Sequence, residues 1–348
     1  MKKVKVISIS ALGIILVMLL TTYLYMDSNN KDSMYYANAK EPLEFETAYN
    51  SSEVTHPSVI NLNKKISGYK YWMANTPYVK SNALTENPHI FASNDLVNWE
   101  VPKGLVNPLD IPTISNSQKH YNSDTDLIYN EKKHCFELTW RYVNRDDGMI
   151  TIFYSSSTNG IKWTPRKNII TTKFSDDALL SQSIVYENNI YKMWSVDMDG
   201  SVYYRETKDF KIWSPRKNIV MNYNDPHLKA WHLEVKKQDG KYEMLVDTYY
   251  AVGIPNKKDR KHLSLYHTNS NDALNWSEAK EIIRPTMNVD DFDGKRIYRS
   301  SFIKEGSYYY VYYGGFAFDK STRVGLSYGK TLDDLKGMES KVEILKLK

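Results

Sequence analysis

The chain has 348 residues and a formal net charge of +5, and 13% of its residues are aromatic, including 28 tyrosines and 8 tryptophans. So many aromatic residues favour strands over helices, and the interspersed basic and acidic residues argue against a nucleic-acid-binding protein. The single cysteine, Cys135, excludes an intrachain disulfide.

The N-terminus combines basic residues with an apolar run. Lys2, Lys3 and Lys5 precede about twenty largely apolar residues, Val6 to Tyr25, a pattern typical of an export signal. The run is also long enough to cross a bilayer as a helix. No clear cleavage site follows, so an uncleaved anchor is favoured over a cleaved peptide, and the lysines place the body of the protein outside.

These features divide the chain into three parts. Residues 1–33 are the signal or anchor with a polar tail, residues 34–52 are a linker, and residues 53–348 are one domain. We expect an extracytoplasmic protein that is either secreted or held at the membrane by its N-terminal segment.

One turn recurs along the domain. Four copies end in a tryptophan, and a fifth lacks it: Ser93–Trp99, Ser156–Trp163, Glu206–Trp213, Ser270–Trp276 and Tyr328–Lys336. The Asn and Asp residues in these copies suit tight turns between strands. Each copy follows three runs of strand character. The sequence therefore predicts an all-β, five-bladed β-propeller with four strands per blade, and Lys341–Leu347 is expected to be the last strand. A two-domain sandwich would not explain the repeated turn.

Aligning the first strand of each blade predicts two rings of side chains around the central channel. One ring is Ser58, Asp126, Ser183, Glu234 and Ser301, and the other is His56, Asp124, Ser181, His232 and Arg299. Loops on the same face add Glu86 and Trp231. A structural role for the buried charges is an alternative for each one, but several unlike ionisable groups at one mouth favour a functional site.

Several phrases in the chain resemble a known group of enzymes. These phrases are His56–Val59, Tyr69–Met73, Glu86–Pro88, Tyr121–Ile128, Trp231–Val235 and Tyr298–Phe302. Together they make residues 53–340 similar to bacterial and phage proteins related to the five-bladed glycosidases of glycoside hydrolase family 43, such as arabinanases, xylosidases and invertases. The resemblance implies a sugar substrate and a carboxylate mechanism. The chain departs from that pattern at His56, where an Asp is usual, and in the third blade, where Ser181 to Ser183 includes no carboxylate.

We therefore expect an extracytoplasmic glycoside hydrolase or polysaccharide-modifying enzyme. Glycoside cleavage needs a protonated carboxyl and an ionised partner, so Glu234 is predicted to be the general acid and Asp124 or Asp126 the base or stabiliser. The residues expected to hold the substrate are His56, Glu86, Trp231, His232 and Arg299.

Two other functions remain open. The missing first-blade Asp favours a non-catalytic glycan-binding propeller, and the Trp turns are similar to those of sialidases, although that family needs an arginine cluster on the open face. The expected partners are a polysaccharide or oligosaccharide and the membrane, and we expect a monomer. No cofactor motif is present, and a calcium ion in the channel remains open.

Overall fold

The computed structural model describes residues 37–113, 118–251 and 259–347, without the side chains of residues 259–262. The predicted signal or anchor, residues 1–33, lies outside these ranges. No helix within the described ranges is long and apolar enough to cross a membrane.

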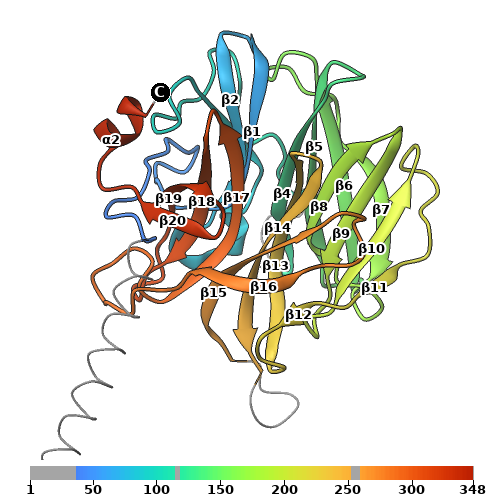
Figure 1. Cartoon of the computed structure of the whole chain (residues 1–348). Coiled ribbons are helices and arrows are strands. Elements are labelled where there is room, and N and C mark those ends of the chain that lie inside the picture. Colours follow the sequence, from blue (N-terminus) through green and yellow to red (C-terminus); the bar gives the residue numbers. More distant parts are fainter. Residues whose placement is uncertain (1–36, 114–117, 252–258, 348) are drawn as a thin grey trace, which may run out of the picture. The chain divides into compact units, whose positions relative to one another are not determined.

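Residues 37–347 form a propeller of five sheets, which Figure 1 shows as successive colours around the fold. The first blade contains β1 (Val54–Ile66), β2 (Tyr69–Pro77) and β3 (His89–Ser93), followed in the second blade by β4 (His120–Asn130), β5 (Cys135–Asn144), β6 (Met149–Ser157) and β7 (Lys167–Lys173). The third blade contains β8 (Leu180–Glu187), β9 (Ile190–Val196), β10 (Val202–Thr207) and β11 (Lys217–Ile219).

The fourth and fifth blades complete the ring. The fourth contains β13 (Leu228–Gln238), β14 (Lys241–Tyr250), β15 (Asp259–Ser270) and β16 (Glu278–Ile283), with the short β12 (Asn222–Tyr223) parallel to β16. The fifth contains β17 (Arg296–Glu305), β18 (Tyr308–Phe316), β19 (Thr322–Thr331) and β20 (Asp334–Gly337). Within each blade, successive strands are antiparallel neighbours, as predicted.

The first and fourth blades depart from the predicted four strands, and the fifth blade has four strands but not the predicted last one; in the fourth, the short β12 adds a fifth strand. The first blade has three, because the chain after Trp99 makes only an isolated bridge between Ala92 and Glu100. In the fifth blade the last strand is β20, so the expected strand at Lys341–Leu347 is wrong. Those residues form the short helix α2 (Lys341–Lys346), which buries Ile344 against the core. A tight turn between Thr331 and Asp334 brings β20 back along β19. Because β20 occupies the outer edge of the sheet, no edge position is left for Lys341–Leu347.

Residues 37–52, part of the segment predicted to be a linker, pack against the propeller. The backbone N–H of Leu43 donates to the carbonyl of Val324 in β19 at 2.8 Å, and Phe45 lies in the same buried cluster as the first and fifth blades. Ala39 N–H donates to the Tyr313 hydroxyl at 2.8 Å. The segment that precedes the first blade is thereby bound to the last blade.

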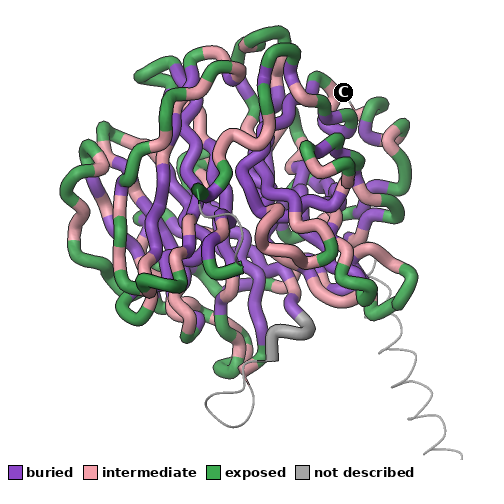
Figure 2. The backbone as a smooth tube through the Cα atoms, turned by 180° about the vertical axis from the view of Figure 1, so that it is seen from behind, coloured by how far each residue is buried: buried purple, intermediate pink, exposed green. Residues whose placement is uncertain are grey.

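The repeated turns are stabilised by their own polar side chains. In the first, Oδ1 of Asp95 accepts from the N–H groups of Val97 and Asn98 at 3.1 and 2.8 Å, an Asx-type arrangement. Asp272 makes the same contacts in the fourth blade. In the second, Gly160 has φ +74°, and an added Cβ would lie 2.4 Å from the Trp72 ring. The buried backbone follows the inner strands (Figure 2), while the turns are exposed.

Candidate active site

All five inner strands shift register near the same end. The shifts lie between Thr55 and Ser58, Ser123 and Asp126, Leu180 and Ser183, Ala230 and His232, and Tyr298 and Ser300. In the first three blades the shift includes a non-glycine residue with a left-handed backbone, namely His56, Asp124 and Ser181, at φ 52°, 52° and 51°. Bulges redirect side chains, and such strained residues concentrate at functional sites.

Three of these residues meet at the channel mouth. Ligand atoms of His56, Asp124 and His232 all lie within 4.8 Å of one another. Oδ1 of Asp124 is 3.4 Å from Nε2 of His56 and 3.1 Å from Nδ1 of His232. None of these three buried atoms makes a hydrogen bond within the described structure. Two imidazoles and a carboxylate with an open side are a common donor set for catalytic divalent metals.

Neighbouring contacts fix the first histidine for such a role. Nδ1 of His56 lies 2.9 Å from the hydroxyl of Thr76, which leaves Nε2 directed at Asp124. A metal-ligating histidine usually binds an outer group through its other nitrogen in this way.

The charges of the three groups also suit a metal. Burial lowers the pKa of His56 to about 3 and lowers that of His232, so both rings are neutral near pH 7. Burial would raise the pKa of Asp124, but His56 and His232 outweigh it and hold that pKa well below its usual range. Neutral imidazoles and an ionised carboxylate are the protonation states that bind metal.

The cluster lies in a pocket of about 500 Å³. Its other lining residues include Glu86, Arg141, Trp231 and Tyr298. Oε1 of Glu86 lies 3.7 Å from Nδ1 of His56, and burial, followed by the charge of Asp124, raises the pKa of Glu86 well above its usual range. The pocket therefore holds a second carboxyl beside the histidine–aspartate cluster.

Aromatic rings form one wall of the same pocket. The Tyr298 ring lies 5.3 Å from the His56 ring and 4.2 Å from the His232 ring between centroids. Nε1 of Trp231 donates to the Tyr298 hydroxyl at 3.3 Å. Half-buried aromatic rings that line a polar pocket suit the apolar face of a sugar.

The other predicted carboxylates lie in a separate buried cluster. One Nη of Arg299 donates to Asp126 at 3.3 Å and to Glu234 at 3.1 Å. Glu234 also accepts from Ser301 at 2.6 Å and Ser58 at 3.2 Å. Burial and the charge of Glu234 raise the pKa of Asp126 to about 7. None of Asp126, Glu234 and Arg299 lines the 500 Å³ pocket.

The eight residues predicted from the sequence thus fall into two groups. His56, Glu86, Asp124, Trp231 and His232 line the pocket, and Asp126, Glu234 and Arg299 do not. Sequence reasoning missed Arg141 and Tyr298. Arg141 lies within a strand whose sequence indicates a buried core strand. Tyr298 directly precedes Arg299, at the register shift of β17, and residue types alone do not reveal that shift.

Comparison with known proteins supports the fold. No protein-family model matches the chain. A curated relative, A type blood N-acetyl-alpha-D-galactosamine deacetylase from Flavonifractor plautii, is 27% identical over 308 residues, which is 75% of this chain. The chain spans about two fifths (39%) of the length of that relative.

Solved structures give the same result. The F. plautii N-acetylgalactosamine deacetylase in complex with blood group B trisaccharide has a TM-score of 0.73 at 22% identity, over 89% of this chain and 97% of that one. An exo-1,5-alpha-L-arabinanase from a bovine ruminal metagenomic library has a TM-score of 0.57 at 13% identity, over 80% and 93%. A GH62 alpha-L-arabinofuranosidase from Coprinopsis cinerea has a TM-score of 0.56 at 14% identity, over 86% and 96%.

The chain has the five-bladed fold of these enzymes. The resemblance predicted from the sequence is therefore confirmed at the level of the fold, and the proteins with which the chain shares it are carbohydrate-active enzymes.

Proposed function

We propose that the protein is a metal-dependent hydrolase that removes the acetyl group from an N-acetylated sugar of a glycan outside the cytoplasm. The observation that carries the proposal is the convergence of Nε2 of His56, Oδ1 of Asp124 and Nδ1 of His232 in the lining of the pocket, where these buried atoms make no hydrogen bond with the described residues. The activity of the F. plautii relative supports the choice of an acetamide as the bond that is cleaved.

The proposed cation would supply Lewis-acid chemistry, polarising the acetamide carbonyl and lowering the pKa of water. The protein residues do the rest. Burial raises the pKa of Glu86, and the nearby cation would favour its ionised form; in that form it accepts a proton from the attacking water and returns it to the leaving amine. The Tyr298 hydroxyl donates to the carbonyl oxygen as negative charge develops there. The products are acetate and the free amino sugar, so atoms and charge balance.

Glycosidase chemistry has less support from the geometry. It needs two carboxyl groups on either side of the scissile bond in an open site. Asp126 and Glu234 instead share Arg299 outside the pocket lining. In the proposed scheme their cluster holds the inner strands together, and Glu234, expected from the sequence to be the general acid, has this structural role.

One pair of probes distinguishes the reactions. The p-nitrophenyl glycosides of N-acetylgalactosamine and N-acetylglucosamine release acetate under deacetylation and p-nitrophenol under glycoside hydrolysis. We expect acetate alone, in the presence of a divalent cation. Release of p-nitrophenol would support the glycosidase. Binding of these glycosides with release of neither product would favour the glycan-binding propeller.

A further inference from the structure

A buried arginine of the pocket makes no direct ion pair with any described residue. Arg141 in β5 is only 2% exposed, and its Nε donates to the carbonyl of Ala178 at 2.8 Å. In the described structure its two Nη atoms make neither a hydrogen bond nor an ion pair. They are not fully shielded from solvent either. Since Arg141 lines the pocket, these two nitrogens face its interior.

The other buried arginines are different. Arg205 pairs with Asp177, and Arg299 pairs with Asp126 and Glu234. A guanidinium taken out of water is costly unless a partner compensates for the lost hydration. Arg205 and Arg299 have such a partner in direct contact, whereas Asp124 and Glu86 interact with Arg141 only at longer range, which leaves its two Nη atoms available to a ligand.

Two more cations line the pocket on the same blade. Arg145 lies in the turn between β5 and β6, where its backbone N–H donates to the carbonyl of Lys119 at 2.9 Å. Its guanidinium lies over the Tyr121 ring at 5.7 Å. Lys119 pairs with Asp146 at 2.8 Å, so Arg145 contributes the larger uncompensated charge at the mouth.

The charges on this side of the pocket therefore favour an anion. Glu86 and Asp124 are the acidic lining residues, against Lys119, Arg141 and Arg145. A divalent cation on the histidine–aspartate cluster would add two positive charges. An arginine fork matches the paired oxygens of a carboxylate or a phosphate.

We propose that Arg141 and Arg145 bind an acidic group of the glycan, so that the substrate is an acidic polymer in which a carboxylate or phosphate adjoins the N-acetylated sugar. The N-acetylated sugar in this inference rests on the proposed function, whereas the acidic group is inferred from Arg141 and Arg145 alone. Arg141 contacts the acid inside the pocket, and Arg145 contacts it at the mouth.

The test compares three oligosaccharides of equal length by calorimetry with the full-length protein. One alternates N-acetylglucosamine with glucuronic acid, one contains N-acetylglucosamine alone, and one joins N-acetylglucosamine residues by phosphodiesters. We expect at least one acidic oligosaccharide to bind about tenfold or more tightly than the neutral one, with a difference that shrinks as salt is added. The better of the two identifies the acid as a carboxylate or a phosphate.

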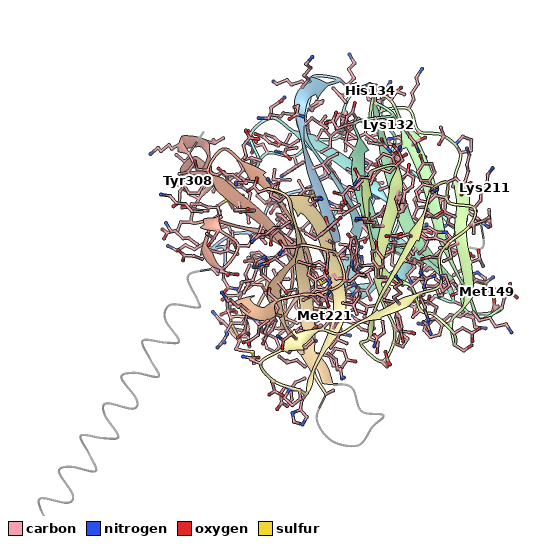
Figure 3. The ribbon with its side chains drawn as sticks, turned by 45° about the vertical axis from the view of Figure 1, so that its right-hand side comes forward. Lys132, His134, Met149, Lys211, Met221 and Tyr308 are labelled. Carbon is pink, nitrogen blue, oxygen red and sulfur yellow. The ribbon has the colours of Figure 1, made fainter. Side chains whose placement is uncertain are left out.

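Matched variants assign the effect to the pocket. Arg145→Gln removes an exposed charge and should weaken acidic binding by about tenfold while leaving neutral binding unchanged. Lys211→Gln removes a charge in the turn after β10, at the outer edge of the molecule (Figure 3), whereas Met198 of the pocket lies in the loop before β10; this variant should change neither. Arg141→Lys keeps the charge but loses the fork, and should also weaken acidic binding selectively.

The outcomes separate the two proposals. Equal affinity for all three oligosaccharides, no binding of either acidic one, or an equal loss for acidic and neutral oligosaccharides in Arg145→Gln would overturn the acidic-substrate inference. Selective acidic binding without release of acetate from any of the three would leave this inference standing and contradict the deacetylase.

Discussion

Nδ1 of His232 lies 3.1 Å from Oδ1 of Asp124, yet neither atom makes a well-aligned hydrogen bond with any described residue. The same carboxylate oxygen lies 3.4 Å from Nε2 of His56. Buried polar atoms rarely remain unpaired, so three of them directed at one point indicate a missing central group. The proposed divalent cation would satisfy all three, and it would account for an aspartate and two histidines with left-handed or bulged backbones at that point.

The first prediction concerns metal binding to the folded protein. Saturating metal should raise the melting temperature of the wild type, since a ligand at about 100 times its Kd contributes about 2.7 kcal/mol. Asp124→Asn removes the charged ligand and should abolish that increase. Asp209→Asn, in an exposed turn of the opposite face, is the matched control. An undiminished metal-induced shift in Asp124→Asn would show that the cation binds elsewhere.

The second prediction concerns the carboxylate cluster around Arg299. Glu234→Gln leaves that buried guanidinium with a weaker partner, and breaking a buried pair costs about 3–5 kcal/mol. Chemical denaturation should therefore show a large loss of stability, whereas metal affinity should be little changed. Unchanged stability together with lost cleavage of unactivated glycosides would instead restore Glu234 as the general acid predicted from the sequence.

The third prediction is a pH dependence of stability away from the pocket. Burial would lower the pKa of His267, but Asp333 and Glu243 outweigh burial and raise it. A raised folded pKa means that the stabilisation is complete below the ordinary histidine value of 6.5 and is lost as the pH rises through the folded value. The pKa of Asp333 is lowered to about 2, chiefly by its hydrogen bond with His267. The contribution of Asp333 to stability is therefore present above the ordinary value of 3.8 and is lost as the pH falls toward 2.

Thermal melts across pH check this sign. The difference in melting temperature between the wild type and His267→Gln should be greatest between about pH 4 and 6.5. It should shrink at higher pH, and Asp333→Asn should flatten the profile in the same way. A difference that grows above pH 7 would contradict the assignment.

Much of the fold could be predicted from the sequence because local chemistry repeats. The Asn- and Asp-containing turns before each tryptophan mark the blades, and the inner strands lie where strand character predicted them. The helix at Lys341–Lys346 was missed because Val342 and Ile344 alternate as in a strand, while Val342 and Leu345 are spaced as in a helix, so the short run fits either period. Only the tight turn that returns β20 along β19 decides between them.

The site was predicted in part. The alternation of side chains along the inner strands predicted that His56, Asp124 and His232 face the channel. The bulges that direct these side chains toward one another could not be predicted, because no glycine marks them in the sequence. The three come from three blades, far apart in the chain, so no ligand spacing signals a metal. In the sequence Arg141 is one residue of a buried strand, and only the structure shows that it lines the pocket.

The most direct test of the central claim is the metal dependence of acetate release. Full-length protein stripped with a chelator should release no acetate from the N-acetylhexosamine glycosides or from the preferred acidic oligosaccharide. Adding back a divalent cation should restore release in the wild type but not in Asp124→Asn. Acetate release that survives complete removal of metal, or that Asp124→Asn retains, would contradict the account.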